Sequence, residues 1–180
     1  MKKALVLFAQ GSEELEAVTI VNILRRAGIA VTLAGTAAGA LHGSRSIAIQ
    51  PDATLDAVLN EDFDLIVLPG GQPGTRNLNA DPRVLQLVRN MADGGKLVAA
   101  ICAAPMVLAT AGLLDGKDAT SFPGCLDDYP KVRLQTCAIV EDGNLITSRG
   151  PGTAMDFALL LAERLAGRAV REKVEAGLVR

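Results

Sequence analysis

Among the three cysteines of the chain, Cys102 has the sequence surroundings of a nucleophile. It stands between an apolar run at 97–101 and the small residues Ala103 and Ala104, which precede Pro105. A buried strand that turns into a helix through one residue with small neighbours is typical of a nucleophile elbow. We expect the helix dipole and free N–H groups to lower the pKa of this thiol. The alternative is a small cysteine buried at a strand end, and the pattern favours neither interpretation.

Three carboxylates could serve such a thiol as a proton donor or acceptor. Glu13, Glu14 and Glu16 follow the first apolar run, where a helix is expected to begin. The spacing does not decide which of them points inward. For any single one, a solvated position in the first helical turn is the ordinary interpretation.

A third segment, which contains two glycines, follows another apolar run. Gly70 and Gly71 permit close backbone approach, so an N–H there could face a ligand, although glycines after strands are also ordinary turn residues. Ligands of open parallel sheets bind at the carboxyl ends of the strands. We therefore expect the segments 10–16, 69–71 and 101–105 to form one site.

The remaining cysteines and the only histidine are weaker candidates. Three widely spaced cysteines with the single His42 do not match a four-ligand zinc site, and we predict no metal. His42 is expected on the surface, away from the three segments. Cys137 is expected to be buried in a strand and inert, whereas Cys125 lies in a loop with a resolving role as a minor alternative.

Composition restricts the classes of protein that remain. The 180 residues suit a single domain, 1–180, and no apolar run reaches the roughly 18 residues of a membrane helix. The net charge of −2, the absence of Trp and the single Tyr argue against a nucleic-acid-binding surface. We expect a cytoplasmic protein that neither spans a membrane nor binds nucleic acid.

Strand and helix signals alternate along the chain, which predicts a doubly wound α/β fold with a mostly parallel sheet. Strands are expected at 3–9, 29–34, 64–68, 97–101, 138–140 and 145–147, with a short edge hairpin near 46–49. Helices are expected from 12 or 13 to about 28, and at 53–59, 82–92, 103–111 and 153–165, with a short helix after 167.

Four motifs together resemble the ThiJ/PfpI superfamily. Within it they are similar to the branch of the parkinsonism-associated protein deglycase (DJ-one) and the bacterial YajL-like proteins. The motifs are Gly11-Ser12-Glu13-Glu14-Leu15-Glu16, Leu68-Pro69-Gly70-Gly71, Ala100-Ile101-Cys102-Ala103-Ala104-Pro105 and Thr147-Ser148-Arg149-Gly150-Pro151-Gly152-Thr153. They occur in the expected order and the resemblance covers essentially the whole chain.

The resemblance implies a flavodoxin-like fold, with helices on both faces of the sheet, and a homodimer. It implies that Cys102 is the nucleophile and that Glu16 is a protonated carboxyl group bonded to the sulfur. By the same resemblance, Gly71 and Ala103 supply backbone N–H donors, with Gly70 beside them. The segment at Pro151 approaches the active site of the partner subunit.

Two positions depart from family patterns. Peptidase-like members have histidine directly after the cysteine, where this chain has Ala103, which argues against a peptidase. Many animal members of the branch have a pocket histidine before a proline, where this chain has Phe122. Glu16 is then the only evident acid or base.

The first functional hypothesis is an enzyme without cofactor or metal that acts on reactive 2-oxoaldehydes or early glycation adducts. In it, the Cys102 thiolate attacks the aldehyde carbon and Glu16 moves the protons. The second is a redox-responsive stress protein or chaperone in which Cys102 is oxidised to sulfinic acid. A hydratase or amidase-like activity rests on the breadth of the superfamily alone.

Overall fold

A seven-stranded sheet forms the centre of the protein, whose computed structural model describes all 180 residues. Its strands are β1 (Lys3–Phe8), β2 (Ala30–Gly35), β5 (Ala53–Thr54), β6 (Leu65–Leu68), β7 (Leu97–Ile101), β10 (Ile139–Asp142) and β11 (Leu145–Ser148). They lie in the order β10-β11-β7-β6-β1-β2-β5, and every neighbouring pair is parallel except β10 and β11. The predicted doubly wound α/β fold is confirmed.

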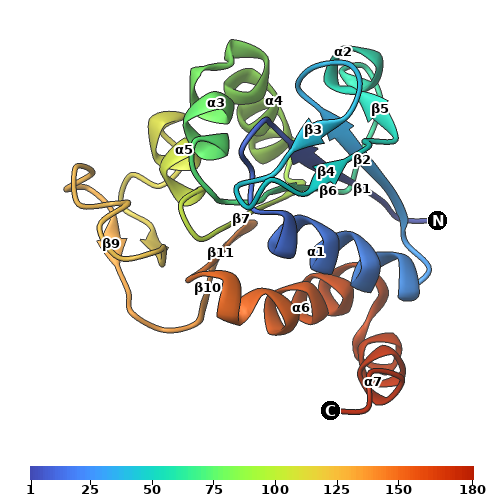
Figure 1. Cartoon of the computed structure of the whole chain (residues 1–180). Helices are drawn as coiled ribbons and strands as arrows, with labels where there is room; N and C mark the ends of the chain where they lie inside the picture. Colours follow the sequence, from blue (N-terminus) through green and yellow to red (C-terminus); the bar gives the residue numbers. More distant parts are fainter.

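Helices cover both faces of this sheet (Figure 1). One face carries α1 (Glu14–Arg26), α6 (Ala154–Ala166) and α7 (Arg168–Ala176). The other carries α2 (Leu55–Val58), α3 (Gly74–Ala80), α4 (Pro82–Asp93) and α5 (Pro105–Thr110). The inner strands are therefore buried on both sides, which is why β1 and β6 consist almost entirely of apolar residues.

The first helix shows how the sequence fixes one of these layers. Ala17, Ile20, Val21 and Leu24 are buried and recur at helical spacing, so they form the stripe that faces the sheet. The helix ends just before Gly28, whose φ of 75° lies in the left-handed region that favours glycine.

Several short elements differ from the sequence-based prediction. The expected helix at 53–59 is divided into β5 and α2, and α3 was not predicted. The edge hairpin near 46–49 consists of β3 (Leu41–His42) and β4 (Ala48–Ile49). A second pair, β8 (Asp118–Ala119) and β9 (Arg133–Leu134), was also missed, and a 3-10 turn, η1 (Pro151–Thr153), precedes α6. Two-residue strands carry too few alternating residues to give a sequence signal.

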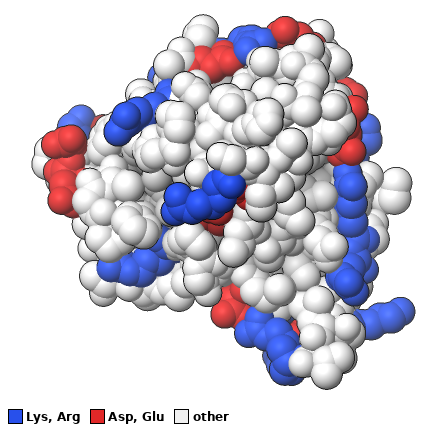
Figure 2. All heavy atoms as spheres, viewed as in Figure 1, with Lys and Arg blue, Asp and Glu red and all other residues white.

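Charged side chains lie mainly around the rim of the face shown in Figure 2, and uncharged atoms cover most of its middle. None of the helices combines the length and the apolar character that a membrane crossing would require.

Candidate active site

The carboxyl ends of three neighbouring strands form one site. From β1 the chain continues to β2 on one side, whereas β6 and then β7 lie on the other, so the order of the strands reverses beside β1. Ligands of open α/β sheets bind at such a point. The loops after β1, β6 and β7 meet there, and the Glu13 N–H donates to the Gly70 carbonyl over 2.8 Å.

Cys102 occupies a tight turn between β7 and α5. Its φ of 63° is a left-handed conformation that non-glycine residues seldom adopt, as expected for an elbow. The surrounding backbone holds it there, since its N–H donates to the Ser148 carbonyl over 2.9 Å and its carbonyl accepts from the Phe122 N–H over 2.8 Å. The residue is 8% exposed, so the sulfur lies at the base of the site.

Gly70 is required by the close approach of two backbone segments. A Cβ at this position would lie 2.7 Å from the Cys102 Cβ and 2.9 Å from the Ala103 nitrogen. Real side chains do not tolerate such distances, so a side chain here would displace the elbow. Gly70 also donates its N–H to Glu16 Oε2 over 2.7 Å.

Glu16 is fully buried beneath the elbow. Its Oε1 is buried and makes no hydrogen bond of regular geometry. The Cys102 thiol lies beside this carboxyl group and interacts with it. Burial raises the pKa of Glu16 to about 7 and the charge of Glu13 adds to this effect, although the bond from Gly70 and the contact with Cys102 oppose it. Near neutral pH the carboxyl group therefore exists in both protonation states.

The pKa of Cys102 is shifted in the direction opposite to the one predicted from the sequence. Burial first, and then the negative charge of Glu16, raise it to about 12, although the N–H groups of Gly71 and Ala103 favour the thiolate. The short helix α5 begins only at Pro105, and its dipole does not compensate for the loss of water. Burial and the charge of Glu16 therefore favour the protonated thiol of Cys102, and Glu16 in its carboxylate form can accept its proton.

All three glutamates of the first motif are buried, so the prediction of a solvated acidic turn is wrong. The loop after β3 covers two of them: the Ser44 hydroxyl donates to Glu13 Oε2 over 2.6 Å, and the Arg45 N–H donates to Glu14 Oε1 over 2.9 Å. Burial raises the pKa of Glu14, but its backbone and side-chain hydrogen bonds outweigh this and hold the pKa below its usual value.

The same loop was expected to lie away from the site, and this expectation is also wrong. The Gly11 N–H donates to the His42 carbonyl over 2.7 Å, which brings the loop against the first motif. The His42 side chain is nevertheless exposed and does not line the pocket, as expected for a surface histidine.

A pocket of about 260 Å³ opens above the Cys102 sulfur. Its lining combines predicted residues with three that the sequence did not indicate, namely Ser44, Arg45 and Gln72. It also includes Cys125, for which a resolving role was the minor alternative. The full lining is Glu13, Ser44, Arg45, Gly71, Gln72, Cys102, Ala103, Phe122, Cys125 and Pro151. Gly70 and Glu16 lie beneath this surface. No local signal identifies Arg45, because its position depends on contacts with residues about 30 positions earlier in the chain.

Cys137 has a different environment from the one predicted. It is exposed and lies in a bend before β10, which begins only at Ile139. The strand predicted at 138–140 begins one residue later in the structure, so Cys137 lies two residues before the sheet and the prediction that it is buried in a strand is wrong.

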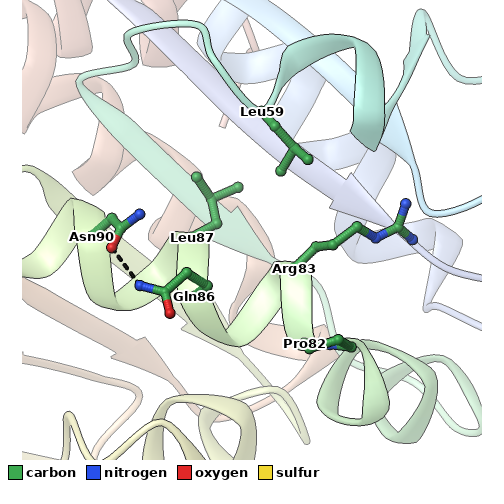
Figure 3. Close-up of a pocket in the computed structure, with 6 residues that line it drawn as sticks. All are labelled: Leu59, Pro82, Arg83, Gln86, Leu87 and Asn90. Carbon is green, nitrogen blue, oxygen red and sulfur yellow. Dashed lines mark hydrogen bonds between the residues drawn. The ribbon is translucent and has the colours of Figure 1, made fainter.

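A larger hollow of about 500 Å³ lies beside α4 (Figure 3), away from the Cys102 pocket. Its polar side chains already have partners, since Gln86 donates to Asn90 and Arg83 is paired with Asp81 and Asp56. It contains no nucleophile, so we place the candidate active site in the smaller pocket. Nowhere do three or more His, Cys, Asp or Glu side chains gather as they would around a metal ion.

Comparison with known proteins gives a consistent result over almost the whole chain. Residues 2–164 match the DJ-1/PfpI family. Protein dj-1beta of Drosophila melanogaster is 47% identical over 99% of this chain and 97% of its own. Its crystal structure covers the same shares of both chains with a TM-score of 0.96, at 45% identity.

Two other relatives extend the comparison. The Parkinson disease protein 7 homolog of Danio rerio is 42% identical over 99% of this chain and 97% of its own. A protein named deglycase PH1704, from Pyrococcus horikoshii, is 34% identical over 83% of this chain and 90% of its own.

Proposed function

Because the chain belongs to the DJ-1/PfpI family, we propose that it is a cysteine-dependent, cofactor-free enzyme of the glyoxalase or deglycase type. Its substrates would be 2-oxoaldehydes or early glycation adducts. One observation carries the proposal: Cys102 lies at the base of a pocket, beside a buried carboxyl group, Glu16, with a pKa of about 7. The archaeal relative named a deglycase supports the same class of activity.

The first step would be addition of the thiol to the aldehyde. Glu16 as carboxylate accepts the Cys102 proton while the sulfur attacks the aldehyde carbon, which gives a hemithioacetal. A base with a pKa near the working pH is the most effective at this transfer. The N–H groups of Gly71 and Ala103, which favour negative charge on the sulfur, would also stabilise the developing oxyanion.

The second step would be a proton transfer between the two carbons of the substrate. Glu16 first returns the thiol proton to the hemithioacetal oxygen, and as carboxylate it then takes the proton of the aldehyde carbon and delivers it to the carbon of the former ketone. The hydroxyl proton passes from the first oxygen to the second, and the product is a thioester of a 2-hydroxy acid. Water then releases the acid and restores the Cys102 thiol. No oxidant or cofactor is needed, because one carbon is oxidised as its neighbour is reduced.

The size of the pocket fits this class of substrate. Its volume of about 260 Å³ lies below the roughly 300–1,000 Å³ of pockets for drug-sized ligands, so small dicarbonyl compounds are favoured. A glycation adduct would enter as the tip of a side chain of another protein.

A second candidate is a redox-responsive stress protein or chaperone in which Cys102 is oxidised to sulfinic acid. The observation that favours it is the same set of N–H groups from Gly71 and Ala103, together with a protonated Glu16, which would form charge-assisted hydrogen bonds to a sulfinate.

The test is the conversion of methylglyoxal to lactate in the absence of glutathione. We expect the wild type to turn over, and Cys102→Ser and Glu16→Gln to be inactive. Cys137→Ser is the matched control, because it removes an exposed thiol outside the pocket and should leave the rate unchanged. Equal rates in the wild type and Cys102→Ser would refute the enzyme proposal and leave the redox candidate.

We also propose that the chain forms a homodimer. Leu15 and Val18 on α1 and Ile47 in the β3–β4 turn are about half exposed, and together they border an apolar surface hollow. Apolar side chains that cluster on a surface mark contact sites. We expect Val18→Asp to convert the dimer to a monomer in sedimentation experiments. A wild type that sediments only as a monomer at micromolar concentration would refute this.

A further inference from the structure

Two cysteines from separate segments line the same pocket. Cys102 follows β7, whereas Cys125 belongs to the loop between β8 and β9. Both line the pocket whose volume is about 260 Å³. The proposed reaction uses Cys102 and gives no role to Cys125. The third cysteine, Cys137, is exposed and does not line the pocket.

Hydrogen bonds tie the backbone of Cys125 to the elbow. The Phe122 N–H donates to the Cys102 carbonyl over 2.8 Å, and the Cys125 N–H donates to the Phe122 carbonyl over 3.1 Å. The second bond closes a four-residue turn, whose first and last Cα atoms are within about 7 Å of each other. Cys125 is therefore held one turn away from the residue that bonds to Cys102.

This turn is open to solvent. Phe122, Pro123 and Gly124 are exposed, and no atom lies within 4 Å of a Cβ built on Gly124. Beyond the turn, Leu126 is buried and anchors the chain. A disulfide requires Cα atoms about 4.4–6.8 Å apart, so a bond between the two cysteines requires this turn to close over the pocket toward Cys102.

We propose that Cys125 is a resolving cysteine, which forms a disulfide with Cys102 after a hydroperoxide has oxidised Cys102. The inference rests on the nucleophilic Cys102 of the proposed function, and it adds a reversible redox site to the same pocket. Formation of the disulfide consumes the sulfenic acid of Cys102 before peroxide can oxidise it further to the sulfinic acid, which is not readily reversed.

Each step balances. The Cys102 sulfur attacks one oxygen of the hydroperoxide, the O–O bond breaks, and the leaving oxygen takes a proton to become water or an alcohol. The Cys125 sulfur then attacks the Cys102 sulfur, the S–OH bond breaks, and the hydroxide leaves as water with the Cys125 proton. The peroxide is reduced by two electrons and two thiols become one disulfide, which a dithiol returns to its original state.

The environment of Cys125 agrees with the order of these steps. Burial, followed by the negative charge of Asp127, raises the pKa of its thiol. The pKa of Cys102 is raised as well, but Cys102 lies beside the Glu16 carboxyl group, which can accept its proton. Cys102 therefore reacts with the peroxide first, and Cys125 attacks the electrophilic sulfur that results.

The chain permits a direct test, because trypsin places its three cysteines on different peptides. Cleavage after Lys and Arg yields residues 97–117 with Cys102, 118–131 with Cys125 and 134–149 with Cys137. The full-length protein is treated with two equivalents of hydrogen peroxide, without a carbonyl substrate, alkylated and digested without reductant. Because no substrate is present, the result does not depend on whether the glyoxalase reaction occurs.

We expect a product that joins 97–117 to 118–131, with a mass about 2 Da below the sum of the two peptides, and its loss on reduction with dithiothreitol. In Cys125→Ser, and in Cys125→Ala as a second variant, the Cys102 peptide should instead gain about 32 Da as the sulfinic acid. The linked product should persist in Cys137→Ser. Circular dichroism checks that each variant is folded.

Three results would overturn the proposal. One is a wild type that gains the same two oxygens as Cys125→Ser without a linked product. Another is a linkage that depends on Cys137, and the third is a Cys102 that peroxide does not oxidise at all.

Discussion

Replacing Glu16 with Gln should make the protein more stable at neutral and alkaline pH than the wild type. Glu16 is fully buried, and its pKa is raised from 4.5 to about 7 in the folded protein. A carboxyl group with a raised pKa stabilises the fold fully below its unfolded pKa, and this stability is lost as the pH rises through the folded pKa. The glutamine of the variant would be a neutral group of the same shape that does not ionise, so it avoids this loss.

The expected size follows from the two pKa values. The difference between 4.5 and about 7 corresponds to about 3 kcal/mol, since each tenfold change in proton affinity is worth about 1.4 kcal/mol. The free energy of unfolding of Glu16→Gln minus that of the wild type should therefore rise by about 3 kcal/mol between pH 4.5 and pH 8. Cys102 does not contribute in this window, because its pKa is raised from 9.0 to about 12 and its effect begins only at higher pH.

The assay is urea unfolding of both proteins at a series of pH values. Glu141→Gln is the matched control, because the ion pair with Arg164 lowers the pKa of Glu141. The stability that this carboxylate contributes is lost only below about pH 4.5, so the difference from the wild type should stay nearly constant between pH 4.5 and pH 8. A stability difference for Glu16→Gln that stays constant across the series would refute the raised pKa. A difference that falls with pH would show that the bond from Gly70 stabilises the carboxylate more than burial destabilises it.

Three further substitutions test other parts of the structure. Gly70→Ala should cost about 1–3 kcal/mol of stability and abolish turnover, because its Cβ would lie 2.7 Å from the Cys102 Cβ. Gly152→Ala is the control and should be neutral in thermal unfolding, because a Cβ there meets nothing within 4 Å. Equal melting temperatures for the two variants would contradict this prediction. Leu24→Ala should cost about 2–5 kcal/mol in urea unfolding, because the side chain is fully buried between α1 and the sheet, and a loss below about 1 kcal/mol would argue against this packing. Phe122→His places a titratable group on the pocket wall and should raise methylglyoxal turnover by about tenfold or less. The pH–rate profile should then show a second ionisation. An unchanged profile would show that no proton passes through this position.

Local patterns in the sequence determined the fold and the backbone of the site. The apolar runs of β1, β6 and β7 predict strands buried on both faces, and these strands are present. The turn at Gly143, with φ of 65°, joins β10 and β11, and both strands lie where the sequence predicts them. Such signals suffice because they depend on neighbouring residues alone. The motifs also indicated the correct family, and they selected Cys102 and Glu16, which the fold brings together.

Other features depend on residues that are distant in the sequence. The helix α3 was missed because only Gly74, Thr75 and Leu78 of its seven residues are buried, and Gly74 packs directly on the backbone of Ser12. These residues give no apolar periodicity, so only the neighbouring segment explains the helix.

The chemistry of the site was decided in the same way by tertiary structure. Helix position alone predicts a lowered pKa for Cys102, whereas burial and the charge of Glu16 raise it. Arg45 and Cys125 line the pocket because separate loops fold over the elbow. A sequence records which groups are available, but their pKa values and their neighbours depend on the water that folding removes and on the charges that it brings together.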